Sequence, residues 1–362
     1  MNAMRINAAP TTLAVDLAKS VFELAYADVG ARVVERRRLG RTAFAKELGN
    51  RGPLHVVMEA CSSANYWGRK FARQGHQVTL LPAHAVRPYV HGNKTDRADA
   101  AGLLEALRCG SLRSVPVKTV EQQGVQALHR AREFHKAQRT AAINLVRGLL
   151  AEYGIVIPLG SRKVRPAVLV ALEDAENELP MDLRAAMFDL LDSIAQAEQA
   201  MLAIEAHLRA FVERDVRSQR LQHAGGIGLL TATALSAEVG ELDRFHSGRQ
   251  FASYLGLTPR EHSSGTQRHP GHVTKRGNVY LRTLLIHGAR AVLQSAKVAH
   301  NKGQPLDHTR AWALALAERV GHNRAAVALA NKTARRLWAA EHHRTSFDPN
   351  HVSERVAPAP VH

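Results

Sequence analysis

Residues 11–16, Thr11-Thr12-Leu13-Ala14-Val15-Asp16, place a carboxylate at the end of a short apolar run. Two more strand-like stretches, 21–29 and 32–39, follow across short turns, a spacing typical of three antiparallel strands. The apolar stretches 55–59 and 77–81 then alternate with helical patterns. Three consecutive strands followed by alternating strands and helices predict an α/β domain, a mixed sheet flanked by helices.

Beyond residue 115 the strand signals stop, and the domain organisation follows from that change. The α/β domain is expected over residues 11–115, and a helical linker resembling a coiled coil is expected over residues 116–215. A compact all-α domain with glycine-rich turns is expected over residues 216–341. The polar, proline-containing tail, residues 342–362, is expected to be disordered.

The linker contains a heptad pattern in the helix expected over residues 183–213. Its apolar positions are Met187, Ile194, Met201 and Leu208, and three places on Leu190, Ala197, Ile204 and Phe211. Such a seam suits either self-association, as a dimer or tetramer, or packing inside a single-chain bundle. The pattern leaves both possibilities open.

The net charge of the chain indicates what kind of molecule it binds. The chain has 49 Lys and Arg against 32 Asp and Glu, a formal net charge of +17, so a polyanion is the expected partner. No apolar run approaches the roughly 20 residues of a membrane span, and the first ten residues lack the layout of a secretory signal. We therefore expect a soluble, cytoplasmic protein. Its two cysteines are too few for a disulfide framework or a cysteine zinc site.

Four carboxylates occupy positions where a metal site could form. Asp16 and Glu59 each end a strand, and acids at the ends of adjacent strands can face one pocket. Asp96 and Asp99 stand three residues apart at the start of a helix capped by Thr95, so both project from one face. Clustered acids repel one another unless cations neutralise them, and Mg²⁺ prefers such oxygen ligands. Two such ions can promote phosphodiester cleavage.

A structural role is the alternative for each acid taken alone, as a turn former or helix cap. Their joint placement on this strand pattern, within a basic chain, instead favours a nuclease of the ribonuclease H-like fold.

Glycines and cations in the C-terminal half suggest contacts with nucleic acid. The turn around Gly226 and Gly228, followed by Thr231, resembles the helix-hairpin-helix motif, in which backbone N–H groups at a helix start bind phosphate. A plain tight turn is the alternative. Further phosphate contacts are expected from four cations, Arg130 and Arg139 on a long helix and Lys275 and Arg276 in a loop.

A serine in the same cationic loop could offer its hydroxyl to a phosphate. Ser264 precedes Gly265, although serine in a glycine-rich loop is ordinarily a turn residue. Ser263 beside it leaves a one-position ambiguity.

Taken together, six motifs resemble the DEDD transposases of the insertion-sequence one-ten family. They are Val15-Asp16-Leu17-Ala18-Lys19, Met58-Glu59-Ala60, Lys94-Thr95-Asp96-Arg97-Ala98-Asp99, the Gly226-Ile227-Gly228 hairpin, Tyr254-Leu255-Gly256-Leu257 with Ser264-Gly265, and Lys275-Arg276-Gly277-Asn278. The resemblance covers roughly residues 11–340 in the family's order. It implies an N-terminal RuvC-like domain, a coiled-coil linker and a C-terminal transposase domain with a serine nucleophile.

The resemblance also implies site residues and partners. Asp16, Glu59, Asp96 and Asp99 match the family's acidic tetrad, with Mg²⁺ as the cofactor, and Ser264 matches the serine that precedes glycine. The implied partners are donor and target DNA and a structured noncoding guide (bridge) RNA from the element.

These observations predict a transposase or site-specific recombinase that cuts DNA through a covalent phosphoserine. Such a link conserves the energy of the broken phosphodiester, so strands can be rejoined without ATP. The first alternative is a RuvC-type hydrolytic nuclease that uses metal-activated water, for which Ser264 is dispensable. The second is a nucleic-acid-binding protein without catalysis, in which the acids are structural.

Overall fold

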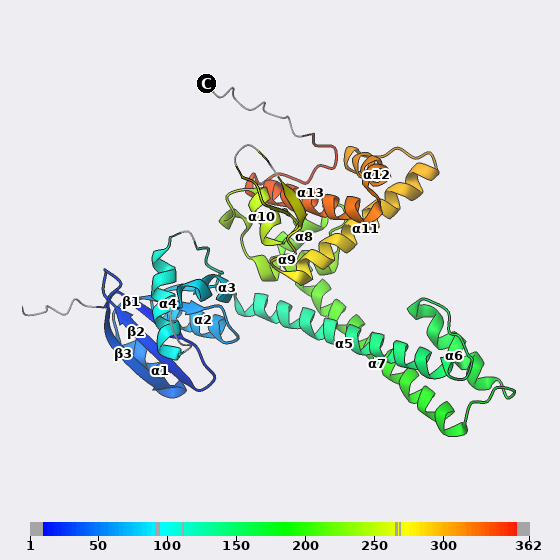
Figure 1. Ribbon diagram of the computed structural model, residues 1–362, viewed down its shortest axis with the longest axis horizontal. Coiled ribbons are helices and arrows are strands. Elements are labelled where there is room, and N and C mark those ends of the chain that lie inside the picture. The colour runs from blue at the N-terminus through cyan, green and yellow to red at the C-terminus, as the bar shows by residue number, and fades with distance from the viewer. Residues whose placement is uncertain (1–9, 91–94, 111, 265–266, 268, 353–362) are drawn as a thin grey trace, which may run out of the picture. The chain divides into compact units, whose positions relative to one another are not determined.

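The chain forms two compact units, Met1–Glu121 and Gln122–His362, each with its own hydrophobic core (Figure 1). The computed structural model describes residues 10–90, 95–110, 112–264, 267 and 269–352.

A five-stranded mixed sheet forms the centre of the first unit, in the order β3-β2-β1-β4-β5. The strands β1 (Thr12–Asp16), β2 (Val21–Ala27) and β3 (Val33–Gly40) are antiparallel, and β4 (His55–Glu59) and β5 (Gln77–Leu81) extend the sheet parallel to β1. Asp28 Oδ1 accepts hydrogen bonds of 2.9 Å from the backbone N–H groups of Gly30 and Arg32, which closes the β2–β3 turn. The predicted mixed sheet flanked by helices is confirmed.

The two faces of the sheet are covered differently. On one face, Val15 and Phe22 pack against Phe44 of α1 (Arg41–Glu47) and Trp67 of α2 (Ala64–Arg73). On the other, small residues such as Ala14 lie under α4 (Asp96–Arg108). Because alanine side chains are short, α4 can approach the sheet closely there. The short elements η1 (Leu48–Asn50), α3 (Ala83–Val86) and η2 (Arg87–Tyr89) complete the unit.

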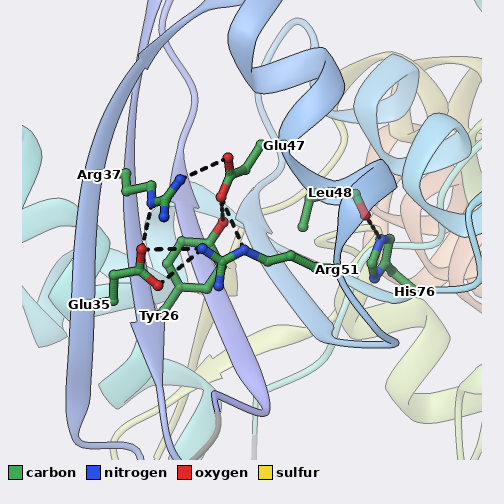
Figure 2. Close-up of polar contacts among 7 residues, drawn as sticks. All are labelled: Tyr26, Glu35, Arg37, Glu47, Leu48, Arg51 and His76. Atoms are coloured by element: carbon green, nitrogen blue, oxygen red, sulfur yellow. Dashed lines mark hydrogen bonds and ion pairs between the residues drawn. The ribbon is translucent and has the colours of Figure 1, made fainter.

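An ion-pair network fixes which way the side chains of the edge strand β3 point (Figure 2). Arg51 donates to Glu47 at 3.0 Å and to Glu35 at 3.1 Å, and its guanidinium lies 4.1 Å from the centre of the Tyr26 ring. Arg37 of β3 joins the same network through Glu47 at 3.2 Å. Because side chains alternate along a strand, the neighbouring arginines of β3 lie on the opposite face, the one under α4.

Two long helices, α5 (Val120–Ala151) and α7 (Met181–Arg214), pack together in the second unit, with η3 (Ser161–Lys163) and α6 (Val164–Glu173) over one end. Ile143 and Leu150 of α5 meet Met187 and Ile194 of α7. At the other end Leu208 of α7 packs with α5 and α9. The heptad seam, which the sequence assigned either to one chain or to two, is therefore buried inside this chain.

The rest of the second unit is a helical core with one small β-ribbon. Its elements are α8 (Val216–Gln222), α9 (Leu229–Val239), η4 (Leu242–Arg244), α10 (Gly248–Tyr254), β6 (Pro259–Glu261), β7 (Pro270–Val273), α11 (Val279–Asn301), α12 (His308–Val320) and α13 (His322–His342). The all-α prediction for this region is wrong at β6 and β7, which pair antiparallel. These strands span only 3 and 4 residues, too few for an alternating pattern to be recognised.

The segment 343–352 departs from the predicted disorder of the tail. Thr309 Oγ1 donates a hydrogen bond of 2.6 Å to the Pro349 carbonyl, and the His308 N–H donates to Asn350 Oδ1 at 3.1 Å. These bonds hold the segment along the start of α12, a contact that composition alone does not reveal. The rest of the predicted tail, residues 353–362, lies outside the described residues.

A buried histidine ties three helices of the second unit together. His129 of α5 is 2% exposed, and its Nδ1 and Nε2 lie 2.8 Å from the Tyr280 hydroxyl and 3.0 Å from Thr233 Oγ1. Burial, together with the nearby charge of Arg132, lowers the pKa of His129 to about 4. The folded chain therefore binds this proton less tightly than the unfolded chain does.

We expect the free energy of unfolding to fall as the pH is lowered from about 6.5 towards 4, by up to about 3 kcal/mol from this residue. His129→Gln should flatten that dependence in thermal melts, because glutamine does not titrate. The control is His135→Gln, since among the described residues the hydrogen-bond partner of the His135 side chain is Gln138 of the same helix. An equal pH dependence of the melting temperature in the wild type and both variants would contradict the assignment of this effect to His129.

Candidate active site

Three of the four predicted acids converge on the face of the sheet that α4 covers. Val15 of β1 lies beside Met58 of the parallel strand β4, so Asp16 and Glu59 end neighbouring strands in register. Alternation places both on the side of Ala14 and Val57, which pack against α4. Asp99 comes from the first turn of α4, whose N-terminus is capped as predicted by Thr95, with its Oγ1 accepting from the Ala98 N–H at 3.2 Å.

Electrostatics shows that two of these acids are close. Burial, and after it the charge of Asp99, raises the pKa of Glu59. Two neighbouring carboxylates repel each other when both are ionised, and a bound cation would offset that repulsion. Carboxylate oxygens are also the donors that a hard divalent cation prefers, so the residues fit such an ion.

The fourth acid, Asp96, begins α4, but its side chain lies outside the described residues. Within the described part of the chain, no group of three or more His, Cys, Asp and Glu side chains is placed to hold a metal ion.

A further carboxylate on this face, that of Glu23, was not predicted from the sequence. Glu23 of β2 is the direct cross-strand partner of Asp16. Alternation along β2, where Phe22 and Leu24 enter one core and Ala25 the other, places Glu23 on the α4 side. That alternation was visible in the sequence, but the pairing with Asp16 depends on the register of the hairpin.

Arginines border the acids on the same face. Arg38 of β3 is the cross-strand partner of Glu23, and Arg36 lies two residues before it. Arg36 donates to the Arg97 carbonyl at 3.5 Å, and burial together with the charge of Arg97 lowers its pKa. Acids flanked by arginines can receive both a metal ion and a phosphodiester.

The predicted serine lies in the segment that joins β6 and β7. The Ser263 hydroxyl is engaged, donating to Glu261 Oε1 at 3.0 Å and accepting from the His269 N–H at 3.2 Å. Ser264 is exposed, and its carbonyl accepts from the Gln267 N–H at 3.2 Å. Its hydroxyl has no hydrogen-bond partner among the described residues, so of the two serines it is the one available to a substrate.

The loop after β7 is closely packed and contains two predicted phosphate contacts, Lys275 and Arg276. The adjacent Gly277 has a φ of +92°, and a Cβ there would lie 2.0 Å from the Tyr254 carbonyl oxygen. Arg282 of α11 also donates to the Arg276 carbonyl at 3.3 Å. Both cationic side chains are exposed, as a phosphate contact requires.

The predicted hairpin exists, formed by α8, the turn at 223–228, and α9. Gly228 is exposed and precedes α9, whose start has no side-chain cap. Gly226 faces α11 instead, because a Cβ on Gly288 would lie 1.9 Å from its carbonyl oxygen. Thr231, in the first turn of α9, is 5% exposed, so its side chain lies in the core. A contact of Thr231 with nucleic acid would have to use its backbone N–H group, and it stays a prediction.

The two predicted cations of α5 differ. Arg139 pairs with Glu198 of α7 at 3.4 Å, so it bridges the two long helices. Arg130 is exposed and has no ion-pair partner in the described part of the chain. Only Arg130 is therefore fully available to a phosphate.

Comparison with known proteins identifies the family. Residues 13–155 match a family model described as a transposase of the DEDD IS110 type, and residues 218–304 match the Transposase IS116/IS110/IS902 family. The chain is 42% identical over 341 residues to a "Probable family 20 transposase" of Pseudomonas aeruginosa, covering 93% of this chain and 98% of the relative. The chain belongs to the IS110 family of insertion-sequence transposases.

Two further relatives of this transposase are informative. It is 41% identical over 327 residues to the transposase for insertion sequence element IS1111A of Coxiella burnetii, covering 90% of this chain and 88% of the relative. It is 26% identical over 231 residues to a pilin gene-inverting protein of Moraxella lacunata, covering 61% of each chain.

The two matched regions of the transposase contain the candidate site residues predicted from the sequence. The first contains Asp16, Glu59 and Asp99, and the second contains Ser264. Membership of the family implies DNA as the substrate and DNA cleavage and transfer as the reaction. No described helix combines the length and hydropathy of a membrane span.

Proposed function

We propose that this transposase is a site-specific recombinase that cuts and rejoins DNA through a covalent phosphoserine at Ser264. The observation that carries the proposal is the contrast between the two serines. The Ser264 hydroxyl is exposed and has no hydrogen-bond partner among the described residues, whereas the Ser263 hydroxyl donates one hydrogen bond and accepts another. In the reaction, the Ser264 Oγ–phosphorus bond forms as the bond from phosphorus to the leaving strand oxygen breaks. The hydroxyl proton passes to a base, and the leaving oxygen is protonated.

The acidic residues would hold the metal in this proposal. Asp16, Glu59, Asp96 and Asp99 are assigned to Mg²⁺, which supplies charge to polarise the scissile phosphate. The sheet order and the carboxylates under α4 support a RuvC-like catalytic domain over residues 11–115. The remaining boundaries stay as proposed, a linker over 116–215 and a transposase domain over 216–341.

A hydrolytic RuvC-type nuclease is the second candidate, because the acids alone could activate water. The relationship to a pilin gene-inverting protein favours recombination, since inverting a gene requires cut strands to be rejoined. Hydrolysis would release the energy that rejoining needs.

Nucleic acid is proposed to bind through backbone contacts. Gly228 at the start of α9 offers N–H groups to a phosphate, and Arg130, Lys275 and Arg276 offer exposed cations. The proposed partners are donor and target DNA and an element-encoded guide RNA, with the reaction taking place in the cytoplasm.

Pairing two DNA sites requires at least two active sites, so we propose a homo-oligomer. The outer face of α7 carries exposed apolar residues at heptad spacing, with Met181 77%, Phe188 50% and Leu202 54% exposed. This stripe is distinct from the buried seam and suits a contact between copies.

Leu202→Glu is therefore expected to reduce the assembly seen by light scattering while leaving the melting temperature unchanged. Ile194→Glu should instead lower stability by several kcal/mol, because Ile194 is 7% exposed in the α5–α7 seam and its replacement buries a charge. Gln199→Glu, which adds the same charge at an exposed position of α7, is the control. Unchanged assembly in Leu202→Glu would exclude this face.

The experiment that tests the proposed function is an adduct assay. The full-length protein is incubated with DNA from the ends of its element and the transcribed flanking RNA, with Mg²⁺ or with excess chelator. We expect a denaturation-resistant protein–DNA adduct that requires Mg²⁺ and is lost without the RNA. Cleaved DNA with no adduct at any time would establish the hydrolytic alternative.

A further inference from the structure

A large cavity with cationic and aromatic walls lies in the second unit, outside both sites described above. It has a volume of about 1120 Å³ and is lined by α10, α12, α13, both strands of the ribbon and the segment 343–352. Binding cavities for small molecules are commonly about 300–1,000 Å³, so this one has room for more than one nucleotide.

The charge of the lining is strongly unbalanced. Among the described residues, the lining contains a single carboxylate, Asp348, against five Arg and Lys side chains, which are Arg249, Arg324, Lys332, Arg335 and Arg336. Two of the lining cations, Lys332 and Arg336, have shifted pKa values. Of these two, Arg336 is the one whose charge is stabilised by carboxylates, those of Asp348 and Asp307. The pKa of Lys332 is lowered by burial and by the charge of Arg336, with no carboxylate to compensate. The cavity therefore favours an anion.

Aromatic rings lie among these cations. Lys332 Nζ is 4.0 Å from the centre of the Trp312 ring, and the Arg336 guanidinium is 4.7 Å from the centre of the Phe347 ring. Trp338 also lines the cavity while its Nε1 donates to the Phe245 carbonyl at 2.9 Å. Flat rings beside guanidinium and ammonium groups are the combination that binds unpaired nucleotides, with bases on the rings and phosphates on the cations.

The position of the cavity indicates which strand would enter it. Pro259 of β6 and Val273 of β7 line it, and Ser264 lies in the segment that joins these two strands. The ribbon whose connecting segment contains Ser264 therefore also forms one wall of the cavity.

We propose that this cavity binds a short unpaired segment of the DNA strand that Ser264 attacks, with a base against Trp312 and phosphates against Lys332 and Arg335. The choice of DNA rests on the proposed function. The chemistry of the cavity, aromatic rings beside an excess of cations, does not depend on it.

The test measures binding of a labelled oligothymidylate of about ten nucleotides to the full-length protein, without metal or guide RNA. Lys332→Ala combined with Arg335→Ala, and separately Trp312→Leu, should each weaken binding about tenfold. Trp312→Phe should restore most of the affinity, because it keeps a stacking surface. Arg319→Ala, an exposed arginine of α12 outside the cavity, should have no such effect.

Competitors distinguish other occupants. Oligouridylate of equal length, duplex DNA and polyglutamate are titrated against the bound oligothymidylate. Stronger competition by the RNA or by polyglutamate would overturn the proposal, as would equal affinities in wild type and cavity variants that melt normally. Cavity variants that lose oligothymidylate binding in a protein that never forms an adduct would refute the proposed function alone. Adduct formation with unchanged oligothymidylate binding would refute the cavity assignment alone.

Discussion

Asp99→Asn is expected to lower DNA cleavage at least about 100-fold, while binding of DNA and RNA is kept or slightly strengthened. A metal ion at a scissile phosphate supplies several kcal/mol of transition-state stabilisation, and each 1.36 kcal/mol is a factor of ten in rate. The charge of Asp99 contributes to the raised pKa of Glu59, so the proposal assigns both carboxylates to the same ion.

The matched control is Glu105→Gln on the same helix, which removes the same charge. Glu105 is exposed and pairs with Arg108 at 3.2 Å, away from the site, so its variant should cleave at the wild-type rate. Full activity of Asp99→Asn, or wild-type cleavage in excess chelator, would contradict the metal assignment.

Titration of Glu59 offers a second readout of the same variant. The raised pKa means that the folded chain holds this proton more tightly than the unfolded chain. Without metal, Glu59 therefore contributes to the free energy of unfolding at low pH. This contribution is lost as the pH rises from the pKa of Glu59 in the unfolded chain through its pKa in the folded chain. In Asp99→Asn the charge of Asp99 is gone, so the pKa of Glu59 should fall and this loss should shrink. Carboxyl chemical shifts from NMR would measure the change, with Glu105→Gln giving the wild-type curve.

Ser264→Ala is expected to eliminate the protein–DNA adduct and strand exchange. The variant removes one exposed oxygen that makes no hydrogen bond with the described residues, so the melting temperature and DNA binding should not change. The adduct is detected as a shifted band after denaturation.

Ser263→Ala is the matched variant and should behave differently. It removes bonds to Glu261 and to the His269 N–H, each typically contributing about 1 kcal/mol, so the loop should loosen and adduct formation should slow only a few-fold. Adduct in Ser264→Ala but none in Ser263→Ala would move the nucleophile by one residue. Normal cleavage by both variants without adduct would replace the serine mechanism with hydrolysis by water.

Local signals were enough to predict the first unit and two of its acids. Period-two alternation and turn residues placed all five strands of the mixed sheet to within two residues. Asp16 and Glu59 were found because each is the polar end of an apolar strand, and Thr95 because caps are local. These features depend only on neighbours in the chain.

Helical periodicity, by contrast, identified α7 but not its partner. The heptad spacing of Met187 and Ile194 requires an apolar surface opposite, and either another helix of the chain or a second copy would satisfy it. The fold provides α5 and α6, so the buried seam is occupied within the chain and the outer stripe of α7 is the face that we propose for a contact between copies.

By itself, the sequence determined the succession of strands along the chain, the acids at the strand ends and the basic charge, since each depends on local pattern or composition. Only tertiary structure placed Glu23 opposite Asp16, turned the Thr231 side chain into the core and bonded the Ser263 hydroxyl while leaving that of Ser264 without a partner among the described residues. Only tertiary structure brought Lys332 over Trp312 and placed both in the lining of one cavity with the segment 343–352. Register, burial and cavities arise between segments far apart in the chain, so no local pattern encodes them.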